Sequence, residues 1–381
     1  MPDPVRLTRL SLTDFRNYTA ATLDIEARLV ALTGNNGAGK TNLLEAVSLL
    51  TPGRGLRRAA FADLVRKVDP QSLPPDGWSV AARLDGPVGE TRIGIGFSSD
   101  TASRRIRIDA EDARTADELS QYLRVFWLVP SMDGLFTGPA GDRRRFLDRL
   151  VLAVDPGHGR RVADFEKAMR SRNRLLETGG EVAWLDAVEV QLASLGIAVA
   201  YARRETVTLL AGLLNDQGGS EPDTFPRAGL ALEGPFEDLA ATTPAADLED
   251  TFAEVMARGR TRDRAAGRTL DGPHRTDLTV THLAKQMPAG LASTGEQKAL
   301  LIGLVLAHAE LTARVSNMTP VLLLDEVATH LDPTRRAALF ARLDVLGGQV
   351  FMTGTDVGLS EALPEGAQRF AVSDAMVHLI E

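Results

Sequence analysis

The sequence predicts an α/β fold in which a mixed sheet around a phosphate-binding loop adjoins an antiparallel β-meander and is split by an all-helical lobe. Three observations predict it. A glycine-rich loop follows an apolar strand near the start of the chain, and helical periodicity runs through its middle. After Asp271 strands and helices alternate again, and one apolar strand there ends in two acids. The two α/β parts are most simply halves of one domain, 1–135 and 268–381, around a helical lobe, 136–267.

Strand patterns open the chain. Arg6 to Asp14 alternates apolar and polar residues, as a half-buried strand does. Leu23 and Ile25 indicate a second strand. Leu29–Leu32 indicates a third strand, which leads directly into the glycine-rich loop.

The loop that follows matches the motif G-x-x-x-x-G-K-[ST], in which backbone N–H groups surround phosphates. Its glycines allow the backbone to approach a phosphate without a Cβ in the way. Lys40 would reach the β- and γ-phosphates of a nucleotide, and the hydroxyl of Thr41 would bind Mg²⁺, which takes oxygen ligands. The predicted nucleotide-binding residues here are Gly34, Asn35, Asn36, Gly37, Ala38, Gly39, Lys40, Thr41 and Asn42. A helix over Thr41–Leu50 should follow and stop at Pro52 and Gly53.

An antiparallel β-meander is predicted after this helix. Three segments, 78–84, 91–97 and 104–108, alternate apolar and polar residues, and turn-forming Gly, Pro, Ser and Asp residues separate them. The proline-rich loop Val68–Gly77 precedes them, and we expect it to be the most flexible segment.

The middle of the chain is predicted to be helical. Helical periodicity covers four segments, Arg143–Val154, Arg161–Glu177, Val182–Leu214 and Ala246–Arg264. The one clear strand pattern among them is Ala228–Leu232. A separate helical lobe accounts for this change of character.

Beyond the lobe we predict a helix over Gln297–Ala313, a strand over Val321–Leu324, a helix over Pro333–Leu346 and a strand over Gln349–Thr353. The apolar run that starts at Pro320 and ends in Asp325 and Glu326 has the form of a Walker B strand. At its end Asp325 would hold Mg²⁺, and Glu326 would polarise the attacking water as a general base.

A short turn precedes the apolar helix. Ser293 and Glu296 form a capping box that would open this helix, and a well-capped helix N-terminus also binds anions. The turn is similar to the signature of ABC-type ATPases. That resemblance implies that Ser293, Gly295 and Glu296 complete the nucleotide site of a second subunit, so that ATP closes a homodimer. Asp332, in the tripeptide that starts at His330, follows at the spacing of the D-loop, which crosses to the other subunit in such dimers.

Composition limits the classes of function. The 381 residues carry a formal net charge of −8, and none is cysteine, which excludes disulfides and thiolate metal sites. The first residues lack the charged and apolar pattern of a signal peptide. The most apolar stretch, Ala299–Leu311, is broken by His308 and Glu310 and is too short to span a bilayer, so we expect no membrane role.

Positive charge is concentrated in two segments of this acidic chain. Residues 141–180 contain ten Arg and Lys against six Asp and Glu, and residues 251–270 contain five against two. Such segments are typical of nucleic-acid contacts, but surface helices often carry them as well. The run Arg143–Arg145 could equally form salt bridges within the lobe.

Together these motifs resemble those of the RecF family of DNA-repair ATPases, relatives of the Rad50 and SMC heads without the long coiled coil. The matching stretches run from residue 15 to past residue 330 and so cover nearly the whole chain. They are Phe15–Tyr18, the phosphate loop, Pro52–Arg57, Arg143–Asp148, Gly272–Arg275, the signature turn and the Walker B strand. The resemblance implies that Arg16 contacts the nucleotide. His274 alone would be an ordinary loop histidine.

The resemblance also implies a function, an ATP-dependent DNA-binding protein of recombinational repair and replication-fork maintenance. ATP and Mg²⁺ would be its cofactors. ATP binding would drive homodimerisation on double-stranded, gapped or junction DNA, and weak, DNA-stimulated ATP hydrolysis would reset the dimer. The implied partners are RecR-like and RecO-like proteins that help to load recombinase, and the implied location is the cytoplasm, in association with the nucleoid.

Two positions depart from the ABC-type pattern. Where such ATPases place a glutamine after a strand, this chain has Ser131 and Asp133. Where transporter ATPases carry a histidine that senses the γ-phosphate, this chain reads Met352–Asp356, and Thr355 is the candidate. Because a hydroxyl stabilises charge less well than an imidazole, we predict slow ATP turnover, below about 10 s⁻¹.

Two alternative functions share the nucleotide motifs. The nucleotide-binding subunit of a transporter is disfavoured by the absent glutamine and histidine and by the long helical lobe. A short SMC-like clamp is disfavoured because the chain has no long heptad arms with which to tether distant strands. Stimulation of ATP hydrolysis by DNA, as opposed to co-purification with a membrane protein, would separate the first alternative from a DNA-binding ATPase.

Overall fold

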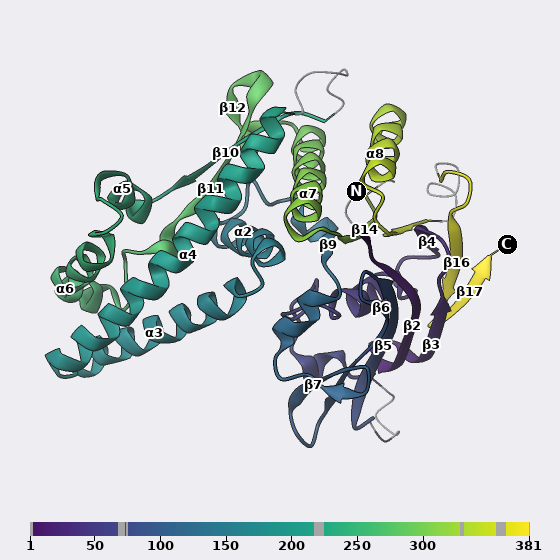
Figure 1. The fold of residues 1–381 in the computed structure, drawn as a ribbon, viewed down its shortest axis with the longest axis horizontal. Coiled ribbons are helices and arrows are strands. Elements are labelled where there is room, and N and C mark those ends of the chain that lie inside the picture. Colours follow the sequence, from purple (N-terminus) through teal and green to yellow (C-terminus); the bar gives the residue numbers. More distant parts are fainter. Residues whose placement is uncertain are drawn as a thin grey trace. The chain divides into compact units, whose positions relative to one another are not determined.

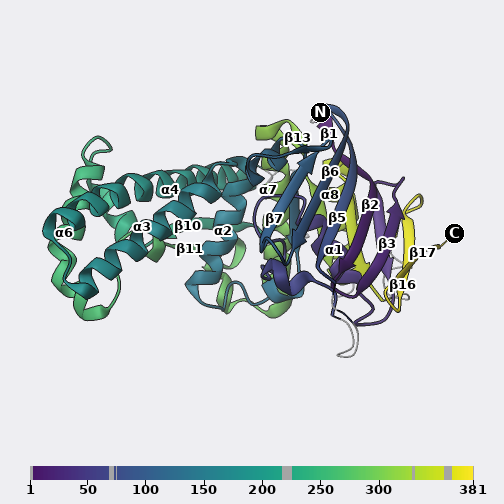
Figure 2. The ribbon, with the colours of Figure 1, turned by 90° about the horizontal axis from the view of Figure 1, so that it is seen from below.

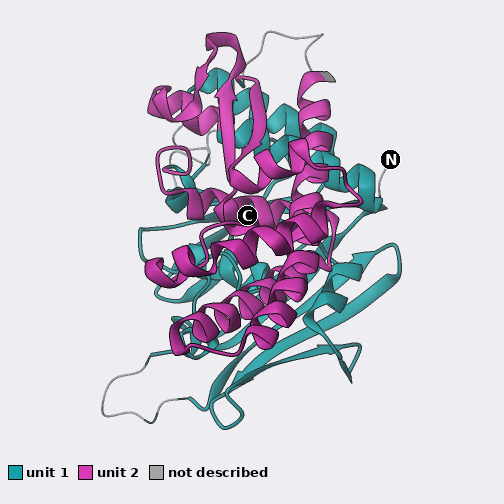
Figure 3. Ribbon diagram, turned by 90° about the vertical axis from the view of Figure 1, so that its left-hand side faces the viewer, with its two compact units in different colours: residues 1–133, 222–225, 301–381 teal, residues 134–221, 226–300 magenta. Residues whose placement is uncertain are grey.

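A computed structural model divides the chain into two compact units (Figure 3). The first unit consists of residues 1–133, 222–225 and 301–381, and the second of residues 134–221 and 226–300. The described residues are 3–67, 73, 75–216, 225–327, 331–355 and 363–380. The second unit extends to residue 300, whereas the predicted lobe ends at residue 267, and the division into domains at residues 135 and 268 remains a proposal.

A six-stranded mixed sheet forms the centre of the first unit (Figure 1). In spatial order its strands are β17 (Met376–Ile380), β16 (Gln368–Ser373), β4 (Leu29–Thr33), β15 (Val350–Gly354), β14 (Val321–Asp325) and β9 (Val125–Leu128). All neighbours are parallel except in the β16–β17 hairpin. Every residue of β4, β14 and β15 is buried, as expected for apolar strands covered on both faces.

The predicted β-meander is an antiparallel sheet in the same unit. Figure 2 shows its strands side by side. They are, in spatial order, β3 (Tyr18–Asp24), β2 (Arg6–Phe15), β5 (Gly77–Gly86), β6 (Gly89–Ser98), β7 (Ser103–Ile108) and β8 (Glu111–Asp112). Burial alternates along β5 and β6, so one face of this sheet is apolar. That face joins the mixed sheet and α1 (Lys40–Ser48) in one apolar core, to which Leu12, Val80 and Leu43 belong.

Smaller elements complete the first unit. The helix α8 (Pro333–Leu346) lies between β14 and β15 in the chain, with Asp332 as its N-cap. The short strands β1 (Asp3–Pro4) and β13 (Met318–Thr319) pair in parallel. The 3₁₀ helices of this unit are η1 (Phe61–Leu64), η2 (Ala116–Gln121) and η3 (Pro130–Met132).

The second unit is mainly helical (Figure 1). Its helices are α2 (Ala140–Val154), α3 (His158–Thr178), α4 (Val182–Asp216), α5 (Pro235–Thr242) and α6 (Leu248–Ala266). A three-stranded sheet of β10 (Ala228–Glu233), β11 (Asp277–His282) and β12 (Met287–Pro288) accompanies them. The remaining 3₁₀ helices are η4 (Pro273–Arg275), η5 (Leu283–Lys285) and η6 (Ala289–Leu291), and α7 (Thr294–Ser316) runs along the chain from the second unit into the first.

A buried ion network holds α3, α4 and α6 together. The fully buried guanidinium of Arg172 donates to Glu189 at 2.8 Å and to Asp263 at 2.7 Å, and also to the backbone oxygen of Met256. Arg260 pairs with Glu189 from the outer side. Beside this network, Phe165, Leu192 and Phe252 belong to the apolar core of the unit. Buried charges are tolerated when they are paired in this way, and these ion pairs link the three helices to one another.

Most predicted elements are present. The helix Pro333–Leu346 has its predicted limits, and the strand pattern at Ala228–Leu232 corresponds to β10, a strand within the segment predicted to be a helical lobe. The structure also contains α5, β9, β11 and the β16–β17 hairpin, which the sequence patterns did not predict. Most of the loop Val68–Gly77, expected to be flexible, lies outside the described residues.

Two helices are long and apolar enough to cross a membrane by length and composition alone, Val182–Asn215 and Thr294–Ser316. The apolar stretch Ala299–Leu311 is thus part of a 23-residue helix, so the prediction that it is too short to span a bilayer is wrong. However, 78% of the most apolar window of that helix is buried inside the protein, which is typical of a core helix in a soluble fold.

Candidate functional site

The candidate site lies where parallel strands of the mixed sheet end. The phosphate loop follows β4 directly, Asp325 is the last residue of β14, and Thr353 lies in the intervening strand β15. Because these strands are adjacent and parallel, their carboxyl ends bring three distant parts of the sequence to one edge of the sheet. The positive end of the α1 dipole adjoins the loop, since this helix begins at Lys40.

Backbone geometry requires glycine at two positions of the loop. Gly34 has a φ of 143°, and a Cβ there would lie 2.1 Å from the carbonyl oxygen of Val372 in β16. Gly39 has a φ of 118°, and its Cβ would lie 2.6 Å from both Asn17 Nδ2 and the Tyr18 hydroxyl. A larger residue at either position would push the loop away from its neighbours.

The ammonium group of Lys40 is held inside the loop. Its Nζ donates to the carbonyl oxygens of Gly34 at 2.6 Å and Asn35 at 2.9 Å, and the side chain is buried. A cation in this position can exchange these two carbonyls for phosphate oxygens without a large movement. The loop is therefore shaped for an anion, with its charge already in place.

A cluster of oxygen atoms lies next to the loop. The hydroxyl of Thr41 donates to the Asp325 carboxylate, 3.1 Å from Oδ1 and 3.0 Å from Oδ2. Thr353, which is fully buried, donates to Asp325 Oδ1 at 2.6 Å. A hydroxyl and a carboxylate oxygen in contact are the donor set of a Mg²⁺ site that draws its other ligands from phosphate and water. Among the described residues, no group of three or more His, Cys, Asp or Glu side chains could hold a metal ion by itself.

Glu326 is positioned by the same cluster. Its backbone N–H donates to the Thr353 hydroxyl at 3.0 Å, and its φ of 55° lies in the left-handed region. A non-glycine residue adopts that region at a cost, which the surrounding structure has to offset. Thr353 thus links the carboxylate of Asp325 to the backbone that places Glu326.

A second layer of polar side chains supports the loop. Arg16 forms two hydrogen bonds of 2.8 Å with the buried carboxylate of Glu45, and Arg57 donates to the same carboxylate at 3.0 Å and to Asn42 Oδ1 at 2.6 Å. Asn17 accepts from Asn42 Nδ2 at 2.7 Å. Two guanidinium groups therefore share one carboxylate, which leaves a net positive charge beside the loop. Arg16 is engaged with Glu45, and its predicted contact with nucleotide remains a proposal.

A pocket of about 620 Å³ opens on the outer side of the loop. Asn17 and the segment Gly34–Ala38 form one wall, and Ala371–Ala375, the end of β16 with the hairpin turn, forms the other. The hairpin was not predicted, so this wall was not predicted either. Its register in the sheet follows from the parallel pairing of β16 with β4.

Other predicted residues of the first unit lie at ends of elements. Thr355 directly follows β15 and is exposed. Asp332 is the N-cap of α8 and accepts from the Arg335 N–H at 2.9 Å, whereas His330 lies outside the described residues. Ser131 and Asp133 are both exposed and follow β9, the strand next to β14.

The predicted signature turn lies in the second unit and forms the expected capping box. Ser293 Oγ accepts from the Glu296 N–H at 3.4 Å and donates to Glu296 Oε2 at 2.9 Å, while the Ser293 N–H donates to the same oxygen at 3.1 Å. Lys285 pairs with Glu296 Oε1 at 2.6 Å. The hydrogen bond from Lys285, together with those from Ser293, lowers the pKa of Glu296 to about 2. These hydrogen bonds hold the turn in one conformation, and Ser293, Thr294 and Gly295 are exposed to solvent.

Two further stretches of the family resemblance meet inside the second unit. Arg203 donates to both oxygens of Asp148, at 2.8 and 2.9 Å, and to the carbonyl oxygen of Pro273 at 2.6 Å. His274 contacts the carbonyl oxygen of Thr269 at 3.0 Å, and burial lowers its pKa. These contacts give both stretches a structural role in this unit.

The run Arg143–Arg145 is engaged within the second unit. Arg143 forms a two-pronged salt bridge with Asp277, Arg144 donates to the backbone oxygen of Thr276, and Arg145 pairs with Asp142. Two of the three arginines thus form salt bridges within the second unit, and Asp277, the partner of Arg143, lies beyond the predicted lobe.

Four side chains of the site were absent from the predicted set: Asn17, Glu45, Arg57 and Thr353. Glu45 lies on the side of α1 opposite Leu43 and Val47, so the helical pattern gave no signal that its carboxylate is buried. Thr353 and Arg57 carry no local signal, because their roles depend on partners 28 and 12 residues away.

Comparison with known proteins agrees with this geometry. Residues 6–373 match the family model RecF/RecN/SMC N terminal domain. The DNA replication and repair protein RecF of Rhizobium etli (strain CIAT 652) is 56% identical over 380 residues, 99% of this chain and 100% of that protein, and RecF of Rhizobium rhizogenes (strain K84) is 57% identical over 376 residues, 98% of each.

Solved structures show the same fold. A structure of the recombination mediator protein RecF-ATPrS in the RecFOR pathway has a TM-score of 0.87 at 21% identity and covers 100% of this chain and 99% of that one. An Smc head bound to the C-winged helix domain of ScpA has a TM-score of 0.55 at 14% identity, over 98% and 96% of the two chains. With the sequence relatives, these matches show that the chain belongs to the RecF family of DNA replication and repair proteins.

Proposed function

We propose that this chain binds ATP with Mg²⁺ at the phosphate loop and that ATP binding closes a homodimer on DNA. The contact of Thr41 with Asp325, next to an ammonium group already held inside the loop, is the observation that carries the proposal. The RecF relatives, one of them solved with ATP and one with ATPrS, support the choice of nucleotide.

The roles of the residues follow from their positions. Lys40 binds phosphate oxygens, and Thr41 and Asp325 would hold a Mg²⁺ ion, which would neutralise phosphate charge. Glu326, placed by Thr353, orients the attacking water and accepts its proton. Thr355, at the end of β15, stabilises the charge that develops on the γ-phosphate only weakly, so ATP hydrolysis is slow, with turnover below about 10 s⁻¹. Slow hydrolysis suits a protein that uses ATP to set how long it stays in its dimeric state.

The dimer completes the site. Ser293, Gly295 and Glu296 sit at the start of a 23-residue helix, where the positive end of the helix dipole favours a phosphate. In the proposed dimer this turn docks on nucleotide held by the other subunit, with Asp332 crossing nearby. Two copies then hold DNA together, which makes DNA affinity depend on ATP.

The proposed cellular role is recombinational repair and maintenance of replication forks. The dimer would bind double-stranded DNA at gaps or junctions and help RecO-like and RecR-like partners to load recombinase. The RecFOR pathway named for the solved relative, together with RecF relatives that cover the full chain, supports this role.

A pair of variants tests the shared site. Ser293→Arg keeps the phosphate loop intact but blocks the docking turn, so it should bind ATP and stay monomeric. Glu326→Gln removes the base but leaves Asp325 and Thr41 in place, so its ATP complex should accumulate as a long-lived dimer. Sedimentation with Mg-ATP measures both. A Ser293→Arg protein that dimerises as wild type does, or a Glu326→Gln protein that stays monomeric with ATP bound, would refute the shared-site mechanism.

A further inference from the structure

A cavity lies where α3 and α6 end, within the second unit and apart from the phosphate loop in sequence. Its volume is about 610 Å³, and four exposed arginines line it: Arg170, Arg174, Arg264 and Arg268. Two come from the positively charged segment 141–180 and two from the segment 251–270. The fold therefore brings both positive segments of an acidic chain to one concave surface.

The base of the cavity is rigid. Asp263, which lines it, accepts from the buried Arg172 at 2.7 Å, and Asn173 accepts from the backbone N–H of Thr269 at 2.9 Å and from the Thr269 hydroxyl at 2.7 Å. Arg264 Nε donates to the carbonyl oxygen of Leu176 at 2.8 Å, which joins the last turn of α6 to the last turn of α3. The arginines thus project from backbone that is fixed in relation to the cavity, and a ligand would not have to order it.

Two of the four arginines have no partner of their own. Within the described part of the chain, no hydrogen bond or ion pair involves the guanidinium of Arg174 or of Arg268. Arg170 has only a long, exposed pair with Glu166 at 3.7 Å. Of the two acids that line the cavity, Asp263 is buried and paired, which leaves Glu177 as the exposed one.

Helix ends alone do not account for this charge. Arginines near a helix C-terminus are favoured because each terminus carries about half a negative charge. Two such ends, at Thr178 and Ala266, together with Glu177, balance about two of the four guanidinium groups. A cavity with about two uncompensated positive charges is suited to an anion.

Phosphate is the anion that this lining fits best. One guanidinium group can donate two parallel hydrogen bonds to a phosphate group, and such contacts form whatever the base sequence of the DNA. A protein partner would require an apolar centre in the contact, whereas Leu176 is the one apolar side chain lining the cavity, and it is buried. We propose that this arginine-lined cavity binds backbone phosphates of DNA, with Arg174 and Arg268 making the direct contacts. The inference rests on the proposed DNA-binding function and names the surface on which that function depends.

The test is binding of fluorescently labelled duplex DNA to the full chain with Mg-ATP, across a salt series. The double variant Arg174→Ala, Arg268→Ala should bind DNA more weakly. The slope of log K against log salt changes by about 0.9 for each phosphate that a protein neutralises. If each arginine neutralises one phosphate, the slope of the double variant should therefore be shallower by about 2 for each subunit that contacts DNA. Glu177→Gln removes the exposed negative charge and should strengthen binding severalfold.

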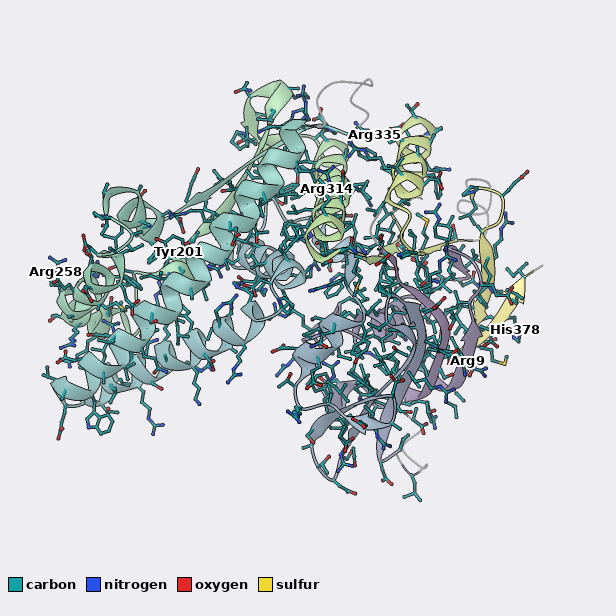
Figure 4. All side chains as sticks on the ribbon, in the orientation of Figure 1. Arg9, Tyr201, Arg258, Arg314, Arg335 and His378 are labelled. Carbon is teal, nitrogen blue, oxygen red and sulfur yellow. The ribbon has the colours of Figure 1, made fainter. Side chains whose placement is uncertain are left out.

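Arg258 supplies the matched control. It is an exposed arginine of α6 that does not line the cavity, and Figure 4 labels it. Arg258→Ala removes one exposed positive charge of the second unit from outside the cavity and should leave the salt slope unchanged. Sedimentation with Mg-ATP should show that all variants dimerise as wild type does.

The outcomes separate the two proposals. If the wild-type protein shows no ATP-dependent DNA binding, the proposed function is wrong. If it binds DNA but the double variant has the wild-type salt slope, or if Arg258→Ala lowers the slope equally, the cavity is not a phosphate site, while the proposed function stands.

Discussion

Replacing Thr353 by valine isolates the contact that joins the two acids of the site. Valine keeps the shape of threonine but removes a hydroxyl that donates to Asp325 at 2.6 Å and accepts from the Glu326 N–H at 3.0 Å. Both bonds are shielded from water, since Thr353 is fully buried. A hydrogen bond to a charged group contributes about 1.5–3 kcal/mol, so we expect the free energy of unfolding to fall by about 2 kcal/mol.

The same loss should appear in catalysis, because Glu326 loses the anchor that holds its left-handed backbone. If that anchoring acts in the transition state, about 2 kcal/mol corresponds to a fall in ATP turnover of more than tenfold. Melting temperature should fall by about 4–8 °C. The control Thr353→Ser retains the hydroxyl and should restore most of the turnover. A Thr353→Val protein with wild-type turnover and an unchanged melting temperature would show that this hydroxyl does not position the acids.

Two further predictions concern the second unit. Arg172→Met leaves two buried carboxylates, those of Glu189 and Asp263, without the cation that they share, so the free energy of unfolding should fall by about 3–5 kcal/mol. Urea denaturation measures this change, and substitution of an exposed arginine, Arg258→Met, is the control. A loss below about 1 kcal/mol would contradict the stabilising role of the ion network. Glu296 has a pKa lowered from 4.5 to about 2, so its ionised form stabilises the fold above pH 4.5, and that stabilisation is lost as the pH falls through about 2. An NMR titration should therefore find the Glu296 carboxylate ionised at pH 3.5 and Lys285→Met should raise its midpoint, whereas a wild-type midpoint near 4.5 would exclude the Lys285 contact.

Local sequence determined the chemistry of the phosphate loop. The residues Gly34–Thr41 are contiguous, and their backbone geometry and charge follow from short-range rules: glycine where φ is positive, lysine within reach of the loop, and a helix directly afterwards. The same holds for the capping box at Ser293 and for the helix Pro333–Leu346, each encoded within a few residues. Such elements can be predicted because their energetics depend on neighbours in the chain.

Short or edge elements were harder to predict. β9 has four residues, too few to distinguish a buried strand from part of a helix, and β16 becomes a strand because it pairs with β4, more than 300 residues earlier. The wall of the pocket beside the phosphate loop therefore could not be anticipated. Its position depends on the pairing of strands and on no pattern within the hairpin.

Tertiary structure decided how distant polar groups meet. Thr41 and Asp325 are 284 residues apart, and Arg172 and Asp263 are 91 apart. The nucleotide motifs assigned Thr41 and Asp325 to one Mg²⁺ site, but nothing in the sequence related Arg172 to Asp263 or one positive segment to the other. That the ends of α3 and α6 share one cavity follows from how three helices pack around a buried arginine. The free energy of such contacts lies in long-range burial and charge pairing, which act only once the chain has closed around them.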